Sequence, residues 1–265
     1  MKKTLITLLA LSGMASAEMT DGLVAWWTFD ENATYTSYTG FSSNVATGIT
    51  SSNMHATGGV DGKGYISSHS TGGNMDFYDG MGGMNISASS FTLSFKVKGV
   101  TADYRSIFSM NIGDIGQVNM QTENSGNGDD TCLYNDNAGI EMTDNGVKEA
   151  LRNDDAWANV ILTGDGQTLT LTVNGYSQSV AYTPGTGTKL SNFQLGSQWG
   201  DGGRRVDADF DDLAIWNRAL TDAEVSLLAS GAVANGALPV PEPATTTLSL
   251  LALAGLAARR RRASR

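Results

Sequence analysis

The chain has 265 residues, including 32 glycines and one cysteine, and carries a net charge of −10. Without the two ends described below, about 220 residues remain, enough for one β-sandwich domain but too few for two typical domains. This body keeps 10 basic and 26 acidic residues, a net charge of −16 that repels phosphate backbones and argues against nucleic acid binding.

The N-terminal end has the pattern of a secretory signal peptide. Lys2 and Lys3 precede an apolar run, and Ala15-Ser16-Ala17 supplies the small residues that a signal peptidase accepts. We therefore expect residues 1–17 to direct export and the mature chain to begin at Glu18.

Short alternating apolar runs then predict an all-β body. In the segment 23–29, the residues at 23, 25, 27 and 29 are apolar and share one face of a strand. The segment 91–98 alternates in the same way, with an apolar face at 91, 93, 95 and 97. Both segments predict strands with one side turned to a core.

The segment 157–182 predicts three consecutive antiparallel strands. A strand at 157–162 leads into a glycine-rich turn, and threonine alternates with apolar residues in 168–173. Asn174-Gly175 follows at once and favours the positive φ angles of a type I′ hairpin, so a further strand should return over 176–182.

One helix is predicted near the end of the body. Thr221 and Glu224 form a capping box, Leu220 and Val225 are spaced for a hydrophobic staple, and Gly231 ends the helix. The next residues, 232–247, are small and contain proline, which is typical of a linker.

The C-terminal tail, residues 248–265, joins an apolar run to a basic end. Together with the preceding Pro241-Glu242-Pro243, this order resembles the PEP-CTERM sorting signal, which implies handling by export and sorting machinery. About 11 apolar residues are fewer than the roughly 20 that span a bilayer, so membrane contact should be transient or limited to this tail. An ordinary C-terminal membrane anchor remains the alternative, and cleavage of the tail stays open.

Taken together, the body resembles the LamG-like jelly rolls of the concanavalin A-like lectin/glucanase group. The matching segments are 22–31 at the first strand, 91–94, 157–175 and the closing stretch 210–220. The resemblance implies an antiparallel jelly-roll β-sandwich over residues 18–231 with one short C-terminal helix. Lys96 stands where the family usually has tryptophan, which predicts that this face of the sheet is wet.

The candidate metal ligands in this sequence are carboxylates alone. Cys132 is the only cysteine, so the chain cannot form an internal disulfide. His55 and His69 do not occur in a sequence pattern typical of zinc ligands. The resemblance implies a structural calcium between the first and last strands, with Asp30 and Asp211 as ligands. The alternative is that Asp30 caps a turn while Asp211 accepts a hydrogen bond from a backbone amide.

Catalysis is the weaker interpretation of the acidic residues. Asp207, Asp209 and Asp211 alternate along the last strand and resemble the carboxylate strand of glycosidases with this fold. That strand, however, carries Glu-x-Asp-x-Glu, and Asp211 coincides with the aspartate of any LamG-like closing strand. We therefore expect no enzyme activity.

The best candidate for ligand binding is the glycine-rich loop 198–205. Trp199 would stack on a sugar ring while Asp201 and Arg204 bind its hydroxyl groups. The alternative is that Trp199 plugs the edge of the sandwich. The segment 134–137 is a weaker second candidate.

The other tryptophans lie in expected strands and should be part of the core. They are Trp26, Trp27, Trp157 and Trp216. The sequence thus predicts a secreted, envelope-displayed, non-catalytic binding module for an extracellular glycan or surface polymer. A structural surface protein without ligand and a glycoside hydrolase are the alternatives.

Overall fold

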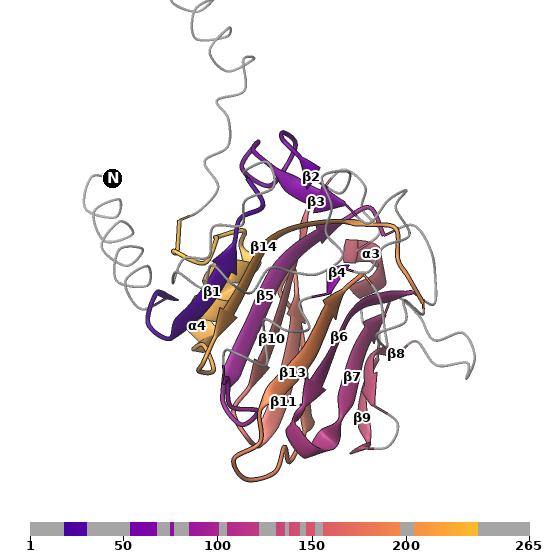
Figure 1. Ribbon diagram of the computed structural model, residues 1–265, viewed down its shortest axis with the longest axis vertical. Coiled ribbons are helices and arrows are strands. Elements are labelled where there is room, and N and C mark those ends of the chain that lie inside the picture. The colour runs from indigo at the N-terminus through magenta and orange to yellow at the C-terminus, as the bar shows by residue number, and fades with distance from the viewer. Residues whose placement is uncertain are drawn as a thin grey trace, which may run out of the picture.

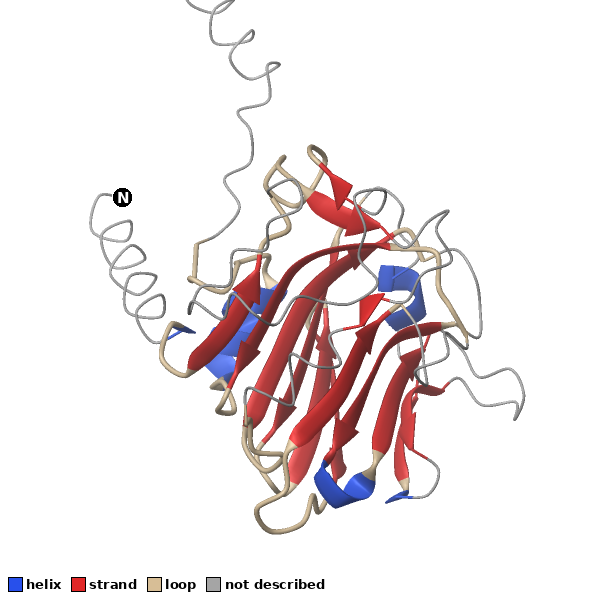
Figure 2. Cartoon of the chain, viewed as in Figure 1, coloured by secondary structure: helices blue, strands red, loops and turns tan. Residues whose placement is uncertain are grey.

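The computed structural model describes ten segments of the chain. They are residues 19–30, 54–67, 75–76, 85–100, 105–121, 131–135, 138–143, 147–151, 156–196 and 204–237. The predicted signal peptide and the C-terminal tail lie outside these segments. Within them, two antiparallel sheets pack face to face, as Figures 1 and 2 show. The predicted antiparallel jelly-roll sandwich is confirmed.

The larger sheet, called sheet A here, has eight strands in the order β12-β11-β10-β5-β14-β3-β2, with β1 paired to β14. Their bounds are β1 Leu23–Trp27, β2 Met54–His55, β3 Tyr65–Ser67, β5 Phe91–Lys98, β10 Ala158–Gly164, β11 Thr168–Val173, β12 Tyr176–Ala181 and β14 Asp209–Trp216. Both β1 and β3 pair with the same edge of β14, β3 at its start and β1 at its end. A bulge in the pairing of β14 with β5 lies between these two contacts.

The smaller sheet, sheet B, has six strands in the order β4-β13-β6-β7-β8-β9. Their bounds are β4 Met75–Asp76, β6 Ser106–Ile112, β7 Gln117–Gln121, β8 Thr131–Asn135, β9 Ile140–Thr143 and β13 Leu190–Leu195. The 3-10 helix η1, Gly113–Ile115, joins β6 to β7. A short helix that the sequence did not predict, α3, spans Val147–Leu151.

The core lies between the sheets and follows the predicted alternation. Phe91, Leu93, Phe95 and Val97 are buried, and so are alternate residues of β1, namely Leu23, Ala25 and Trp27. Phe95 of sheet A meets Phe108 of sheet B edge to face, with ring centroids 5.8 Å apart.

Two of the four tryptophans expected in the core are buried, Trp27 in the core between the sheets and Trp216 in a second apolar cluster that includes Leu228 of α4. Trp27 and Trp216 are 2% and 0% exposed. Trp26 is partly buried on the outer side of β1. Trp157 precedes β10 and is partly exposed, so the core expectation is wrong for Trp157.

The predicted hairpin between β11 and β12 is confirmed. Asn174 and Gly175 have φ angles of 47° and 90°, which a type I′ turn requires at both central residues. Val173 pairs directly with Tyr176, so the two strands remain in register up to the turn.

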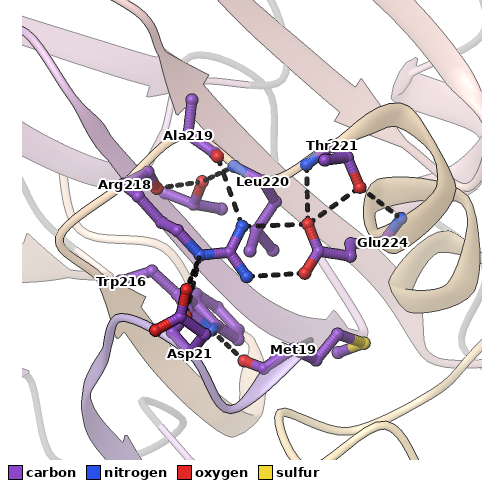
Figure 3. Close-up of polar contacts among 9 residues, drawn as sticks. Met19, Asp21, Trp216, Arg218, Ala219, Leu220, Thr221 and Glu224 are labelled. Atoms are coloured by element: carbon purple, nitrogen blue, oxygen red, sulfur yellow. Dashed lines mark hydrogen bonds and ion pairs between the residues drawn. The ribbon is translucent and has the colours of Figure 1, made fainter. Parts of the chain in front are cut away.

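The predicted helix is α4, Asp222–Ala229, and its capping box is present. Glu224 also accepts hydrogen bonds from Arg218 Nη1 and Nη2 at 2.9 and 2.5 Å. As Figure 3 shows, this guanidinium reaches the segment at the start of the body, where Arg218 Nε donates to the Asp21 carbonyl. Trp216 Nε1 donates to the carbonyl of Met19 in the same segment. These hydrogen bonds therefore connect residues 216–218 to residues 19–21 on the outer side of sheet A.

Lys96 is buried, so the prediction of a wet face around it is wrong. Its side chain is covered where α4 packs on β10 and β11, and it is 4% exposed. Lys96 Nζ donates to Asn159 Oδ1 at 2.8 Å and to the Ala232 carbonyl at 2.9 Å. Burial lowers the pKa of Lys96, although Asp212 and Asp211 oppose this shift.

In the part of the chain that the structure describes, no helix has the length and apolar character needed to cross a membrane.

Candidate functional site

A row of polar side chains crosses the outer face of sheet B. Strand register places one residue from each of five strands side by side: Gln194, Ser109, Asn119, Tyr134 and Glu141. Their strand neighbours, such as Phe108 and Met120, belong to the core. Because successive side chains in a strand point to opposite faces, the polar row lies on the side away from the core.

Most side chains of this row are buried. Asn119 is 3% exposed, and Gln121, two residues further along β7 on the same face, is 0% exposed. Within the described residues, Asn119 Oδ1 and Gln121 Nε2 have no hydrogen-bond partner. A buried polar group without a partner costs about 1–3 kcal/mol, so these two amides need an explanation.

The predicted ligand residue Arg204 lies at this row. Arg204 Nη1 donates to Gln121 Oε1 at 3.2 Å and to the Tyr134 hydroxyl at 2.6 Å. The structure therefore brings together Arg204 and the first residue of the second predicted segment, 134–137. Asn135 has a different role, because its Nδ2 donates to the Ile115 carbonyl at 2.8 Å.

The other two predicted ligand residues, Trp199 and Asp201, lie outside the described residues. The base of their loop is described. Val206 N donates to the Gly196 carbonyl at 2.9 Å, and Gly196 N donates to the Ile107 carbonyl at 2.8 Å. The two ends of the loop thus lie side by side, beside the start of β6 and close to Arg204.

A second feature is an acidic cluster at the bulge of β14. Asp211 is 2% exposed; its Oδ2 accepts from Val60 N and its Oδ1 from Asp212 N, both at 2.8 Å. Burial, followed by the nearby charge of Asp212, raises the pKa of Asp211 to about 9. The backbone closes around this carboxylate so tightly that a Cβ on Gly59 would lie 2.7 Å from Asp211 Oδ2.

Asp212 is part of the same cluster and was not identified from the sequence. It adopts a left-handed conformation with φ 50°, and its Oδ1 accepts a hydrogen bond from Trp26 Nε1 at 3.1 Å. Burial raises the pKa of Asp212 to about 6, while the positive charge of Lys96 opposes the shift. The adjacent Asp-Asp pair in a closing strand is the sequence signal that could have drawn attention to it.

The predicted metal ligand Asp30 lies near enough to raise the pKa of Asp211. Asp30 itself is partly exposed and lies 3.6 Å from Lys63 Nζ, which also pairs with Asp61 at 2.7 Å. Burial and the charge of Asp61 raise the pKa of Asp30. Over the described segments, no three His, Cys, Asp or Glu side chains converge on a point that would hold a metal ion. A cation here would therefore need backbone carbonyls as further ligands.

Residues 61–226 match the concanavalin A-like lectin/glucanases superfamily. The chain belongs to this superfamily. Residues 239–262 match the PEP-CTERM protein-sorting motif, which marks proteins exported to the cell envelope or surface. No curated protein sequence matches the chain significantly.

Solved structures share the fold at low identity. A Trypanosoma rangeli sialidase, in complex with 2,3-difluoro-KDN, is 17% identical over 80% of this chain and 33% of its own, with a TM-score of 0.55. The binding domain of Paraclostridial Mosquitocidal Protein 1 is 18% identical over 80% of this chain and 52% of its own, with a TM-score of 0.52. The chain thus spans a third to a half of these proteins, and the likeness concerns fold alone.

The superfamily fold occurs in a sialidase and in a binding domain, so the fold does not decide between catalysis and binding. The three alternating aspartates have separate environments. Asp207 is exposed, Asp209 Oδ2 lies 3.8 Å from Lys98 Nζ, and both oxygens of Asp211 accept backbone amides.

Proposed function

We propose that this protein is a non-catalytic binding module for carbohydrate, displayed at the cell envelope, and that the outer face of sheet B contacts the ligand. The observation that carries the proposal is the pair of buried amide groups, Asn119 Oδ1 and Gln121 Nε2, which lack partners within the described residues. A bound ligand would supply those partners.

Carbohydrate fits the chemistry of this face. Asn119 Oδ1 accepts and Gln121 Nε2 donates, and a sugar hydroxyl can satisfy either because it both donates and accepts. Tyr134 adds an aromatic ring, and Arg204 adds fixed donors beside it. A few oriented polar groups next to an aromatic surface are typical of sites that recognise sugars.

The loop that contains Trp199 and Asp201 is the second part of the proposed site. Trp199 is five residues from Arg204, so the chain keeps it within roughly 17 Å of that residue. In this proposal Trp199 stacks on a sugar ring, and Asp201 and Arg204 bind its hydroxyl groups.

Two other classes of function remain as outcomes of the test. A structural surface protein would bind no glycan, and a hydrolase would release product from one. The non-catalytic reading rests on the partners of Asp209 and Asp211, because a carboxylate held by Lys98 or by two backbone amides is poorly placed to exchange protons with a substrate.

The proposed function requires that the protein be exported. The sorting motif at 239–262 places the protein at the envelope or surface. We propose that residues 1–17 act as the signal peptide and that membrane contact is confined to the tail. Export machinery and an extracellular glycan or surface polymer are then the partners.

A glycan array probed with the exported protein tests the proposal. Asn119→Ala with Gln121→Ala should abolish the signal, whereas Gln167→Ala, which removes an exposed amide in the turn between β10 and β11, should not. Sugar release during incubation would indicate a hydrolase. If no glycan on the array gives a signal, the proposed binding function is contradicted and a structural surface protein without ligand is favoured.

A structural calcium at Asp30 and Asp211 is the second proposal. It is favoured by the raised pKa of Asp211, because a carboxylate buried beside two others gains most from a neighbouring cation. Asp30, Asp211 and backbone carbonyls near them would hold the ion, which would tie the first strand to the last.

A further inference from the structure

Three aromatic rings meet at the β2–β3 hairpin, two from the hairpin itself and one from the residue before β10. The rings of His55 and Tyr65 stack with centroids 4.6 Å apart and an interplanar angle of 8°. Trp157 contacts Tyr65 edge to face, with centroids 5.9 Å apart. We call these three residues the aromatic patch. His55 is exposed, and the other two are partly exposed.

A charged pair lies beside the aromatic patch. Lys98 Nζ lies 4.8 Å from the ring centroid of Trp157 and 5.6 Å from that of Tyr65, and 3.8 Å from Asp209 Oδ2. These contacts hold the rings in fixed relative positions. The patch is therefore ordered before any ligand arrives, which lowers the entropy cost of binding.

The aromatic patch lies on the outer face of sheet A. Lys98 follows the core residue Val97 and pairs in register with Asp209, so both point away from the core. Figure 1 shows the β2–β3 hairpin at the top of the molecule and α4 lower down, beside β1. The patch and the polar row of sheet B thus occupy opposite outer faces of the sandwich.

The charges restrict what the patch can bind. An apolar partner would bury the Lys98–Asp209 pair without compensation, which is unfavourable. An anion would meet Asp209 and a body with a charge of −16, and a cation would compete with Lys98 for the same rings. A neutral sugar ring brings no charge to the patch and need not displace Lys98, since its C–H face can stack on the exposed ring of His55 while its hydroxyls pair with Lys98 and Asp209.

We propose that His55, Tyr65 and Trp157 form a second glycan-binding site, so that one molecule holds two neutral glycan chains on opposite faces. This inference rests on the proposed carbohydrate-binding function and extends it from binding to cross-linking. Two sites that face apart cannot engage one short oligosaccharide, but they can join separate polysaccharide chains.

The test uses the full-length protein and neutral β-linked hexasaccharides of glucose and xylose. Calorimetric titration should give two sites per chain for the wild type and about one for His55→Ala with Trp157→Ala. Tyr176→Ala is the matched control, because Tyr176 is a 55% exposed aromatic at another edge of sheet A. His55→Ala alone changes an exposed side chain, so it tests the site without endangering the fold.

Cross-linking gives the second readout. The wild type should make a solution of the corresponding polysaccharide turbid, and the His55 and Trp157 variants should bind it without turbidity. Unchanged stoichiometry and turbidity in these variants would overturn the second site and leave the proposed function intact. A wild type that binds none of these neutral sugars would overturn the second site, whereas the proposed function is overturned only if the glycan array also gives no signal.

Discussion

Arg204 Nη1 donates a 2.6 Å hydrogen bond to the hydroxyl of Tyr134, a residue 70 positions earlier in the chain. The bond joins the end of the glycine-rich loop to the C-terminal end of β8. Because Arg204 also donates to Gln121, one guanidinium fixes side chains of two neighbouring strands of sheet B. Arg204 therefore links the end of the loop to the polar row.

Tyr134→Phe tests that link. The change keeps the ring but removes the hydroxyl that accepts from Arg204, so we expect glycan affinity to fall roughly tenfold as the guanidinium loses its position. The free energy of unfolding should fall by only about 0.5–1.5 kcal/mol, the usual value for one hydrogen bond. Isothermal titration and denaturant unfolding measure the two effects. An affinity equal to that of the wild type would remove Tyr134 from the site.

Asn119→Leu separates binding from stability. The Asn119 amide is buried and its Oδ1 has no partner in the described segments, so an apolar side chain with the same branching should not lower the free energy of unfolding. Glycan binding should be lost, because the amide that would hydrogen-bond to the glycan has been removed. Chemical denaturation together with the glycan array checks both parts. A loss of several kcal/mol would mean that the amide stabilises the fold instead.

Trp199→Ala tests the loop prediction. A stacking surface contributes on the order of 1–3 kcal/mol, so its removal should reduce affinity about ten- to a hundredfold while the melting temperature holds. If Trp199 instead plugs the edge of the sandwich, the same change leaves a cavity and lowers the melting temperature by many degrees. Thermal unfolding and binding of one variant decide between the two.

The strands and α4 were predictable because their signals are local. Alternation over 91–98, the Asn-Gly turn at 174–175 and the capping box at Thr221 each specify an element from adjacent residues. The aromatic patch was not predictable in this way. It depends on β2 and β3, which are two and three residues long and too short to show alternation.

The candidate site was only partly predictable. Arg204 and Tyr134 were identified separately, but their contact depends on the order of strands in sheet B. Asn119 and Gln121 alternate with Val118 and Met120, a pattern present in the sequence, but no strand was predicted there. Lys96 was misjudged because its cover, the segment after α4, lies 136 residues away in the chain.

Glu224→Gln should make the protein less stable at neutral pH and less sensitive to acid. Burial would raise the pKa of Glu224, but hydrogen bonds from Arg218 and Thr221 outweigh it and lower that pKa. A carboxylate with a lowered pKa stabilises the fold above its unfolded-state pKa of 4.5, and this contribution is lost as pH falls through the folded-state pKa.

At pH 7 the Glu224→Gln variant should lose about 1.5–3 kcal/mol, the range for hydrogen bonds to charged groups. The difference from the wild type should shrink below pH 4. Asp222→Asn, an exposed acid in the same first turn, is the control and should change little. Melting curves from pH 3 to 7 measure this, and a gap that persists at pH 3 would contradict the assignment.

Calcium should stabilise the protein through Asp30 and Asp211. An ion that binds only the folded state, present at a hundredfold its dissociation constant, adds about 2.7 kcal/mol, or roughly 5–10 °C in melting temperature. Asp211→Asn should abolish this shift, whereas Asp207→Asn, at an exposed position just before the same strand, should preserve it. Melting in calcium and in chelator measures the effect. If the wild type shows no shift, Asp211 acts only by accepting the amides of Val60 and Asp212, and the first and last strands are held by their own hydrogen bonds.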